Sequence, residues 1–168
     1  MTTPQPGVHS VVEQDEQPFV GVTRTLSMAR LKEASDEIPR LFGWLRERGI
    51  APTGPPFVRF LVIDMAADMV VQAGVPVAAP VAADGEIEVG TLPAGRYVTV
   101  VHVGHYDGLY DATTQLLRWA GQQGLHFDKH PSEAGEVWTS RLEWYESDPA
   151  EQPDPRTWVT QLAFKLAD

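Results

Sequence analysis

The sequence predicts an α+β fold built from two similar β-α-β-β units, and two observations support this prediction. A helical pattern, Trp-x4-Gly-aliphatic, occurs twice with a shift of 75 residues, starting at Trp44 and at Trp119. Each copy lies between β-branched stretches that are typical of strands. A one-sided sheet with a single covering helix cannot bury all its apolar surface alone. We therefore expect the units to pack about a pseudo-twofold axis, with a ligand cleft between the halves.

The first half is expected to cover residues 18–78. Its helix, residues 38–50, is predicted from an apolar stripe at the spacing i, i+3, i+4 and i+7. The stripe consists of Ile38, Leu41, Phe42 and Leu45. Ser35 or Asp36 can cap the start of this helix, and Gly49 suits the left-handed residue that ends it. The strands expected in this half are residues 19–26, 57–65 and 69–77.

The second half is expected to cover residues 86–168 and repeats this plan. Its helix includes residues 113–125, with Asp107 as the expected capping residue and Gly124 as the stop. Its apolar stripe consists of Leu109, Ala112, Leu116 and Ala120. The strands expected in this half are residues 96–103, 137–145 and 158–166. A short alternating stretch, residues 86–92, joins the halves.

A chain of 168 residues fits one domain, and residues 18–168 are expected to form it. Residues 1–17 are expected to be a flexible N-terminal tail, too short to form a helix-turn-helix DNA-binding domain. They also lack the apolar core of a signal peptide, and no run approaches the roughly 20 apolar residues of a membrane span. A cytoplasmic location, without membrane partners, is therefore the expectation.

The charge of the chain restricts its partners. With 13 basic and 23 acidic residues, the formal net charge is −10. Such a surface repels phosphate backbones, so nucleic acid is not an expected partner. The negative charge serves either solubility or the attraction of cationic ligands. The chain has no cysteine, which excludes disulfides, thiolate nucleophiles and cysteine metal sites.

Motifs of the common metal and nucleophile sites are absent. His102 and His105 are three residues apart and His126 and His130 four apart, but no third ligand type lies at a suggestive distance, so no metal is expected. There is no Gly-x-Ser-x-Gly elbow and no Gly-x-x-x-x-Gly-Lys loop, so neither a serine hydrolase of that type nor nucleotide use is supported. No cofactor is expected.

One acidic residue is a candidate for function. In the strand expected over residues 137–145, alternation places Arg141, Glu143 and Tyr145 on one face and Trp138, Leu142 and Trp144 on the other. A carboxylate between aromatic side chains in a cleft can attract a cation or act as an acid or base. The alternative is that Glu143 pairs with Arg141 or Arg59 on a solvated face.

Two tyrosines, Tyr106 and Tyr110, stand at the start of the second helix. Helix starts offer free N–H groups and often line clefts. Core packing explains one tyrosine as readily as binding does. Two tyrosines whose hydroxyl groups both need hydrogen-bond partners indicate that the rim of the cleft is partly exposed to water.

Several stretches in order along the chain resemble a known family, the GyrI-like small-molecule-binding domains, which also occur as effector-binding modules of multidrug-responsive transcription regulators. The stretches are Gly54–Phe60, Met69–Val77, Leu92–Tyr97, His102–Leu109, Trp144–Pro149 and Trp158–Gln161. No single motif is decisive, but the ordered set is specific. The resemblance covers about residues 18–167 and implies the duplicated fold, with a hydrophobic cleft for bulky aromatic, often cationic, compounds.

The resemblance also implies roles for residues. Glu143 and Tyr145 are similar to the family's Glu-x-Tyr motif, and Tyr106 matches an aromatic residue of a Gly-Pro-Tyr-Asp-Gly segment. The expected ligand-contacting set is completed by Tyr110, Phe57, Phe60, Trp138 and Gln161. Gln161 and Gln72 stand where the family often has Glu. An amide cannot act as a general acid or base, which counts against mechanisms that need a second carboxylate.

Three functions follow from this resemblance. The first is a stand-alone binding protein that holds hydrophobic, aromatic or cationic compounds in a central cleft, in the manner of a drug-resistance protein. The second is a hydrolase that opens strained rings, such as the cyclopropane of DNA-alkylating natural products, with Glu143 as its catalytic residue. The third is an interaction protein that protects gyrase or another protein partner.

Overall fold

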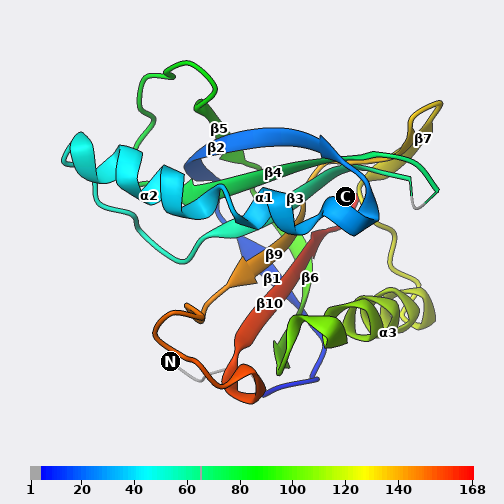
Figure 1. The fold of residues 1–168 in the computed structure, drawn as a ribbon. Coiled ribbons are helices and arrows are strands. Elements are labelled where there is room, and N and C mark those ends of the chain that lie inside the picture. Colours follow the sequence, from blue (N-terminus) through cyan, green and yellow to red (C-terminus); the bar gives the residue numbers. More distant parts are fainter. Residues whose placement is uncertain (1–4, 65) are drawn as a thin grey trace.

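The strands of the computed structural model, which describes residues 5–64 and 66–168, form one curled antiparallel sheet (Figure 1). The strands are β1 (Ser10–Gln14), β2 (Gln17–Leu26), β3 (Phe57–Ile63), β4 (Met69–Pro76), β5 (Glu88–Leu92), β6 (Gly95–Val103), β7 (Lys129–Ser132), β8 (Gly135–Trp138), β9 (Arg141–Tyr145) and β10 (Val159–Lys165). Their order is β1-β6-β10-β9-β3-β4-β2-β5, with β8 also paired to β3 and β7 to β8. The expected α+β class is confirmed.

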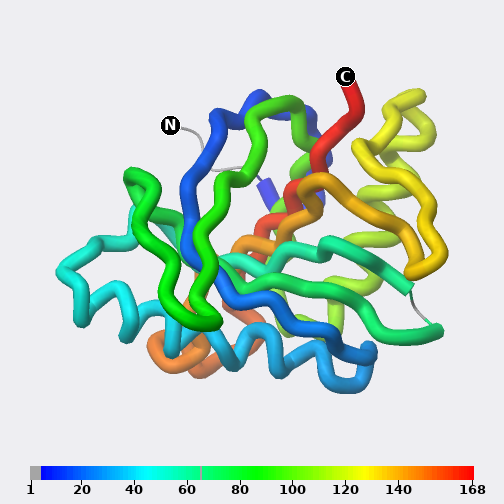
Figure 2. Tube along the Cα trace, turned by 90° about the horizontal axis from the view of Figure 1, so that it is seen from above, coloured from blue at the N-terminus to red at the C-terminus, as the bar shows by residue number. Residues whose placement is uncertain are grey.

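The strand order shows the duplication. At each end of the sheet, the edge strand is followed by the first, third and second strands of one half. From β1 inward these are β6, β10 and β9, and from β5 inward they are β2, β4 and β3. β1 runs into β2 but pairs with β6, and β5 runs into β6 but pairs with β2. Figure 2 shows β2 in blue and β5 in green lying side by side. The pseudo-twofold axis therefore passes between β3 and β9, where the two halves meet.

The helices are α1 (Lys32–Ser35), α2 (Ile38–Glu47) and α3 (Leu109–Gln122), with short 3-10 turns η1 (Met28–Arg30), η2 (Tyr106–Gly108) and η3 (Pro155–Thr157). α2 packs on β4 with Leu41 and Leu45 fully buried, and α3 packs on β6 with Leu116 and Ala120 fully buried. Each apolar stripe thus faces the core as predicted, and both helices lie on the same side of the sheet. No helix in the described part of the chain is long and apolar enough to cross a membrane.

The ends of the two long helices are equivalent. Gly49 and Gly124 have positive φ angles of 66° and 70°. After them, the Ile50 N–H donates to the Leu45 carbonyl at 3.0 Å and the Leu125 N–H donates to the Ala120 carbonyl at 2.9 Å. These bonds are the 6→1 bonds of a Schellman motif, which explains why the Trp-x4-Gly-aliphatic pattern occurs twice.

The predicted helix starts need correction. Asp107 does not cap α3: its N–H donates to Nδ1 of His105 at 3.0 Å, and η2 leads into the helix. Neither Ser35 nor Asp36 caps α2, whose preceding residue is Glu37 without a side-chain capping bond. In both cases a turn leads directly into the helix, and no side chain caps it.

Two strand predictions also need correction. Part of the expected N-terminal tail is β1, which pairs along β6 from Ser10↔Thr99 to Gln14↔Gly95; residues 1–4 of that tail lie outside the described residues. The strand expected over residues 137–145 is interrupted at Thr139 and Ser140. Tyr97 Oη donates to Ser140 Oγ at 3.0 Å, and the Thr139 hydroxyl donates to Asp128 Oδ1 at 2.8 Å. These side-chain bonds hold the chain between β8 and β9 away from regular strand geometry.

The requirement for glycine at the end of α2 can be tested by substitution. Gly49→Ala should lower the free energy of unfolding by about 1 kcal/mol, because a methyl group disfavours a positive φ. Gly43→Ala, inside α2 where an added Cβ meets no atom within 4 Å, should instead be neutral or stabilising. Urea unfolding of both variants measures the difference. Equal stabilities would mean that the helix end does not depend on Gly49.

Candidate functional site

The seam between the halves brings the candidate residues to one place. β3 and β9 pair through Phe57↔Trp144, Val58↔Glu143 and Arg59↔Leu142. Because side chains alternate along a strand, Glu143 and Trp144 lie on opposite faces of the sheet. The cross-strand neighbours of Glu143 belong to the apolar cluster that contains residues of α1 and α3. Glu143 therefore lies on the helix side of the sheet, at the pseudo-twofold axis.

The Glu143 carboxylate has a single hydrogen-bond partner among the described side chains. Tyr145 Oη donates to Glu143 Oε1 at 2.8 Å. Burial raises the pKa of Glu143 above its ordinary value, while the bond from Tyr145 and the charges of Arg141 and His102 oppose this shift. Burial, together with the neighbouring Glu143, raises the pKa of Tyr145 well above the usual value for tyrosine. The site is thus a desolvated carboxylate held by a protonated phenol.

A series of aromatic rings begins at Tyr145, the hydrogen-bond partner of this carboxylate. The ring of Tyr106, from η2, lies 5.6 Å from that of Tyr145 and 4.7 Å from that of Trp158, the residue before β10. His105 stacks on Trp158 at 5.6 Å. Burial raises the pKa of Tyr106, and Asp148 and Glu143 add to this shift. We refer to Glu143, Tyr145, Tyr106 and Trp158 as the Glu143 cluster.

The alternative in which Glu143 forms an ion pair on a solvated face is wrong. Neither Arg141 nor Arg59 forms a salt bridge with any carboxylate in residues 5–64 and 66–168. Arg59 points to the opposite face, where it donates to the Thr139 carbonyl at 2.7 Å and to Gln72 Oε1 at 3.3 Å. Within the described part of the chain, Glu143 therefore has no cationic partner at bonding distance.

The other expected ligand-contacting residues are separated. Phe60 and Trp138 are buried on the helix side, in the apolar cluster next to the Glu143 cluster. The expectation that Trp138 shares a face with Leu142 and Trp144 is wrong, because the strand is interrupted between Trp138 and Arg141. Phe57 is fully buried on the opposite face, 5.0 Å from the Trp144 ring, and Gln161 lies on that face as well. Tyr110 is 66% exposed on the surface of α3. The structure thus brings together Glu143, Tyr145 and Tyr106, and adds Trp158, which sequence reasoning placed in a motif without a role.

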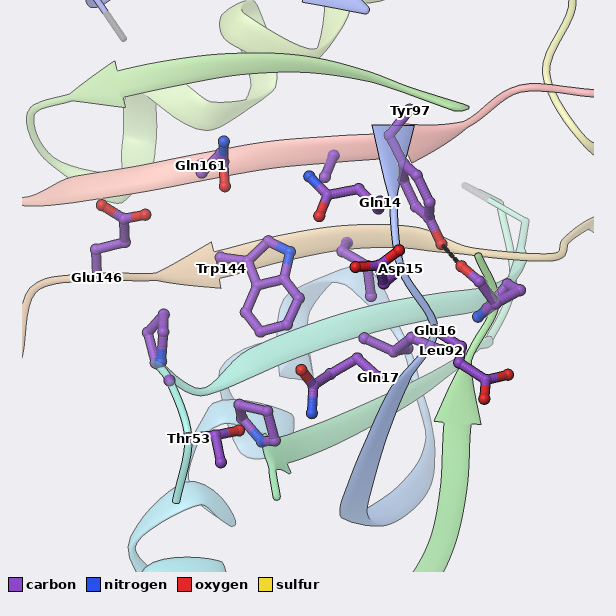
Figure 3. Close-up of a pocket in the computed structure, with 16 residues that line it drawn as sticks. Gln14, Asp15, Glu16, Gln17, Thr53, Leu92, Tyr97, Trp144, Glu146 and Gln161 are labelled. Atoms are coloured by element: carbon purple, nitrogen blue, oxygen red, sulfur yellow. Dashed lines mark hydrogen bonds between the residues drawn. The ribbon is translucent and has the colours of Figure 1, made fainter. Parts of the chain in front are cut away.

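A cavity of about 390 Å³ lies on the opposite face of the seam (Figure 3). The link between β1 and β2 crosses the strands there, and Trp144 and Gln161 project from β9 and β10. The cavity also carries the acidic residues Asp15, Glu16 and Glu146. This cavity was not predicted, because the link that lines it, residues 15–16, was expected to belong to a tail.

A second cavity, of about 450 Å³, lies between the N-terminal segment, β6 and α3, and reaches His102. Nε2 of His102 is 3.0 Å from the His105 carbonyl, which ties the ring to the turn that carries Tyr106. Neither cavity reaches Glu143. In residues 5–64 and 66–168, no group of three His, Asp or Glu is placed to hold a metal ion.

Comparison with known proteins gives a family match. The family model described as GyrI-like small molecule binding domain matches residues 8–166. No curated protein sequence matches the chain significantly. Among solved structures, the EcmrR C-terminal domain has a TM-score of 0.70 and 18% identity, covering 96% of this chain and 98% of its own. EcmrR in a DNA complex has a TM-score of 0.74 and 20% identity over 96% of this chain, which spans 57% of the EcmrR length.

Two further structures share the fold. SAV2435 bound to tetraphenylphosphonium has a TM-score of 0.55 and 11% identity, over 95% of this chain and 94% of its own. A hydrolase from Listeria innocua has a TM-score of 0.62 and 14% identity, over 98% of this chain and 94% of its own. At these sequence identities the similarity shows a common fold and does not show a common function.

Proposed function

Because the chain belongs to the GyrI-like family of small-molecule-binding domains, we propose that it binds hydrophobic, aromatic or cationic compounds at the Glu143 cluster. The observation that carries this proposal is a buried carboxylate without a cationic partner at bonding distance among the described residues; it is bonded to Tyr145, whose ring is followed by those of Tyr106 and Trp158. Desolvation of an unpaired carboxylate costs free energy, and a bound cation would recover it.

The chemistry of the cluster suits an aromatic cation. The faces of Tyr106 and Trp158 attract cations, each worth about 0.5–2 kcal/mol depending on desolvation. Stacking and apolar burial against these rings add affinity that does not depend on charge. In a structure with the same fold, SAV2435 holds tetraphenylphosphonium, a ligand of this class.

The two cavities described above lie away from Glu143, so we propose that a ligand reaches its carboxylate by displacing the rings of Tyr106 and Trp158. Tyr106 and Trp158 are attached to short 3-10 turns, η2 and η3, and not to a strand interior. Side chains on such connections reorient more readily than those of the sheet. On this proposal, the side chains of Tyr106 and Trp158 move aside when the ligand binds.

The first experiment is a titration of the purified protein with tetraphenylphosphonium, followed by tryptophan fluorescence, with mass spectrometry of the recovered ligand. Trp158 belongs to the cluster, so saturable quenching is expected, and Trp158→Phe should remove most of it. Full quenching in Trp158→Phe would place the ligand at another tryptophan, such as Trp144 in the opposite-face cavity. Absence of binding would remove the proposal.

The affinity should also depend on pH. The pKa of Glu143 is raised by burial, so its carboxylate is neutralised at a higher pH than an exposed one. Affinity for tetraphenylphosphonium should therefore be highest above this pKa and fall, by up to tenfold per pH unit, as the pH drops through it. Calorimetry between pH 8 and pH 5 measures the slope, which Glu143→Gln should abolish. A slope that persists in this variant would mean that a group other than Glu143 sets the pH dependence.

A second candidate function is the ring-opening hydrolase, favoured by the desolvated carboxyl group of Glu143. A raised pKa suits a group that protonates a leaving oxygen or orients a water. Positions 72 and 161 both carry glutamine, whose amide is neither an acid nor a base, and Gln161 also lies on the opposite face of the sheet. Glu143 would therefore act without a second carboxylate from these positions. A gain of one water by a strained-ring substrate would establish this function. Protection of gyrase or another partner stays a prediction from the family resemblance.

A further inference from the structure

A guanidinium group lies on the same face as the Glu143 cluster and lacks a partner. Arg141 precedes Glu143 by two positions on β9, so their side chains leave the strand on the same side, roughly 7 Å apart. Among the described residues, Arg141 forms no salt bridge, and its Nε is fully buried without a hydrogen bond. The cation is therefore close to the carboxylate without neutralising it by direct contact.

Aromatic rings hold this guanidinium. Its Cζ lies 4.6 Å from the Phe164 ring centroid, 4.8 Å from that of Trp138 and 5.7 Å from that of Phe60. These residues fix the orientation of Arg141 through cation–π contacts. Burial lowers its pKa to about 10, so the group stays charged at neutral pH. Arg141 is thus a preorganised cation.

The terminal nitrogens of Arg141 are available to a ligand. Nε is buried and unpaired, and Nη1 and Nη2 make no hydrogen bond to a described residue, while the side chain as a whole is partly exposed. Replacing such a cation by an apolar residue of similar volume is often neutral or stabilising in a protein core. Packing alone therefore gives little reason for an arginine at this position.

A second polar group next to the cluster also lacks a partner. Thr160 is fully buried and pairs across the sheet with Tyr145 and with His102, yet its hydroxyl oxygen has no hydrogen bond. Buried polar groups are nearly always bonded, and exceptions point to a missing water, ion or ligand. Unpaired donors therefore occur on both sides of Glu143: the guanidinium of Arg141 and the hydroxyl of Thr160.

We propose that the Glu143 cluster selects aromatic compounds that carry both a cationic group and an anionic acceptor, with the cation at Glu143 and the acceptor, a carboxylate or phenolate, on the fork of Arg141. This rests on the proposed function of the cluster and specifies its ligand class. A planar guanidinium binds such an acceptor through two parallel hydrogen bonds. A ligand with only a positive charge gains from Glu143 but is opposed by Arg141.

Two dyes that differ by one methyl group test this selectivity. Rhodamine 110 carries a free carboxylate beside its cationic ring system, and rhodamine 123 is the methyl ester of the same molecule. By fluorescence anisotropy, rhodamine 110 should bind the wild-type protein five- to tenfold more tightly than rhodamine 123. Arg141→Met should bring this ratio to about one, mainly by weakening rhodamine 110.

The controls separate a binding role of Arg141 from a packing role. Methionine keeps the contact with the three rings, so thermal unfolding of Arg141→Met should be unchanged or shifted upward. Arg141→Lys keeps the charge without the fork and should give an intermediate ratio; it also serves if Arg141→Met fails to fold. A ratio that is unchanged in both variants, or a wild-type preference for rhodamine 123, would overturn the inference.

The same titrations distinguish this inference from the proposed function. If both dyes bind equally and Glu143→Gln weakens both, the cluster is the ligand site and the role of Arg141 is wrong. If tetraphenylphosphonium binds but neither dye does, the selectivity is wrong as well. If none of the three compounds binds, the proposed function itself fails.

Discussion

Glu143→Gln is expected to weaken the binding of tetraphenylphosphonium about 30-fold, which corresponds to roughly 2 kcal/mol. The substitution removes a charge from a partly desolvated position, where electrostatic interactions exceed those in water. Tetraphenylborate, with nearly the same shape and the opposite charge, should bind more tightly to Glu143→Gln than to the wild type. Isothermal titration calorimetry with the two ions measures both changes.

The glutamine variant is a clean test because it should fold. Its side-chain oxygen can still accept the hydrogen bond that Tyr145 donates at 2.8 Å. Loss of a carboxylate whose pKa is raised by burial should leave stability at neutral pH equal or higher. A melting temperature that falls by many degrees would mean that the variant reports on folding and not on the ligand.

Glu146→Gln is the matched control. Glu146 follows β9 three positions after Glu143, is exposed, and lines the cavity on the opposite face. If tetraphenylphosphonium binds at the Glu143 cluster, Glu146→Gln should change its affinity less than twofold. A large loss in Glu146→Gln, with none in Glu143→Gln, would move the ligand to the opposite-face cavity and contradict the proposed site.

The duplicated fold was predictable because its signal is local. Each helix end needs a glycine with positive φ followed by an aliphatic residue, and this pattern is visible at Gly49 and Gly124. The break at Thr139 was not predictable, since the alternation of residues 137–145 continues through it. That break depends on bonds from Asp128 and Tyr97, which the fold brings from other elements.

β1 escaped prediction for a different reason. It is an edge strand with one partly buried apolar residue, Val12, and four exposed positions, so its sequence is that of a polar connection. Its position comes from pairing with β6, a tertiary contact. Because the cavity in Figure 3 is closed by the link that follows β1, the cavity was missed together with the strand.

At the candidate site, residues that share one strand were predicted and residues that meet in space were not. Alternation alone puts Arg141, Glu143 and Tyr145 on one face, as the structure has them. The sequence could not show that Trp158 meets Tyr106, because these residues belong to connections far apart in the chain. It also could not show that Phe57 lies on the other face from Glu143, since this depends on the register between β3 and β9.

Gly74→Ala is expected to have the largest effect on stability, a loss of about 3 kcal/mol. A Cβ at this position would lie 2.3 Å from Cζ of Phe57, well inside van der Waals contact. The Phe57 ring cannot move away, because it is fully buried between the rings of Phe19 at 5.3 Å and Trp144 at 5.0 Å. Thermal unfolding should show a melting temperature about 10 °C lower.

A double-mutant cycle with Phe57→Leu shows whether this clash is the cause. In the Phe57→Leu background the clashing ring atoms are gone, so Gly74→Ala should cost less than half as much as in the wild type. The strain also reaches the site, because Phe57 pairs with Trp144 beside the Val58↔Glu143 pair. Gly74→Ala should therefore weaken tetraphenylphosphonium binding even where the variant is folded, and Phe57→Leu should restore part of it. An undiminished penalty in the double variant would show that Gly74 is required by the backbone and not by the ring.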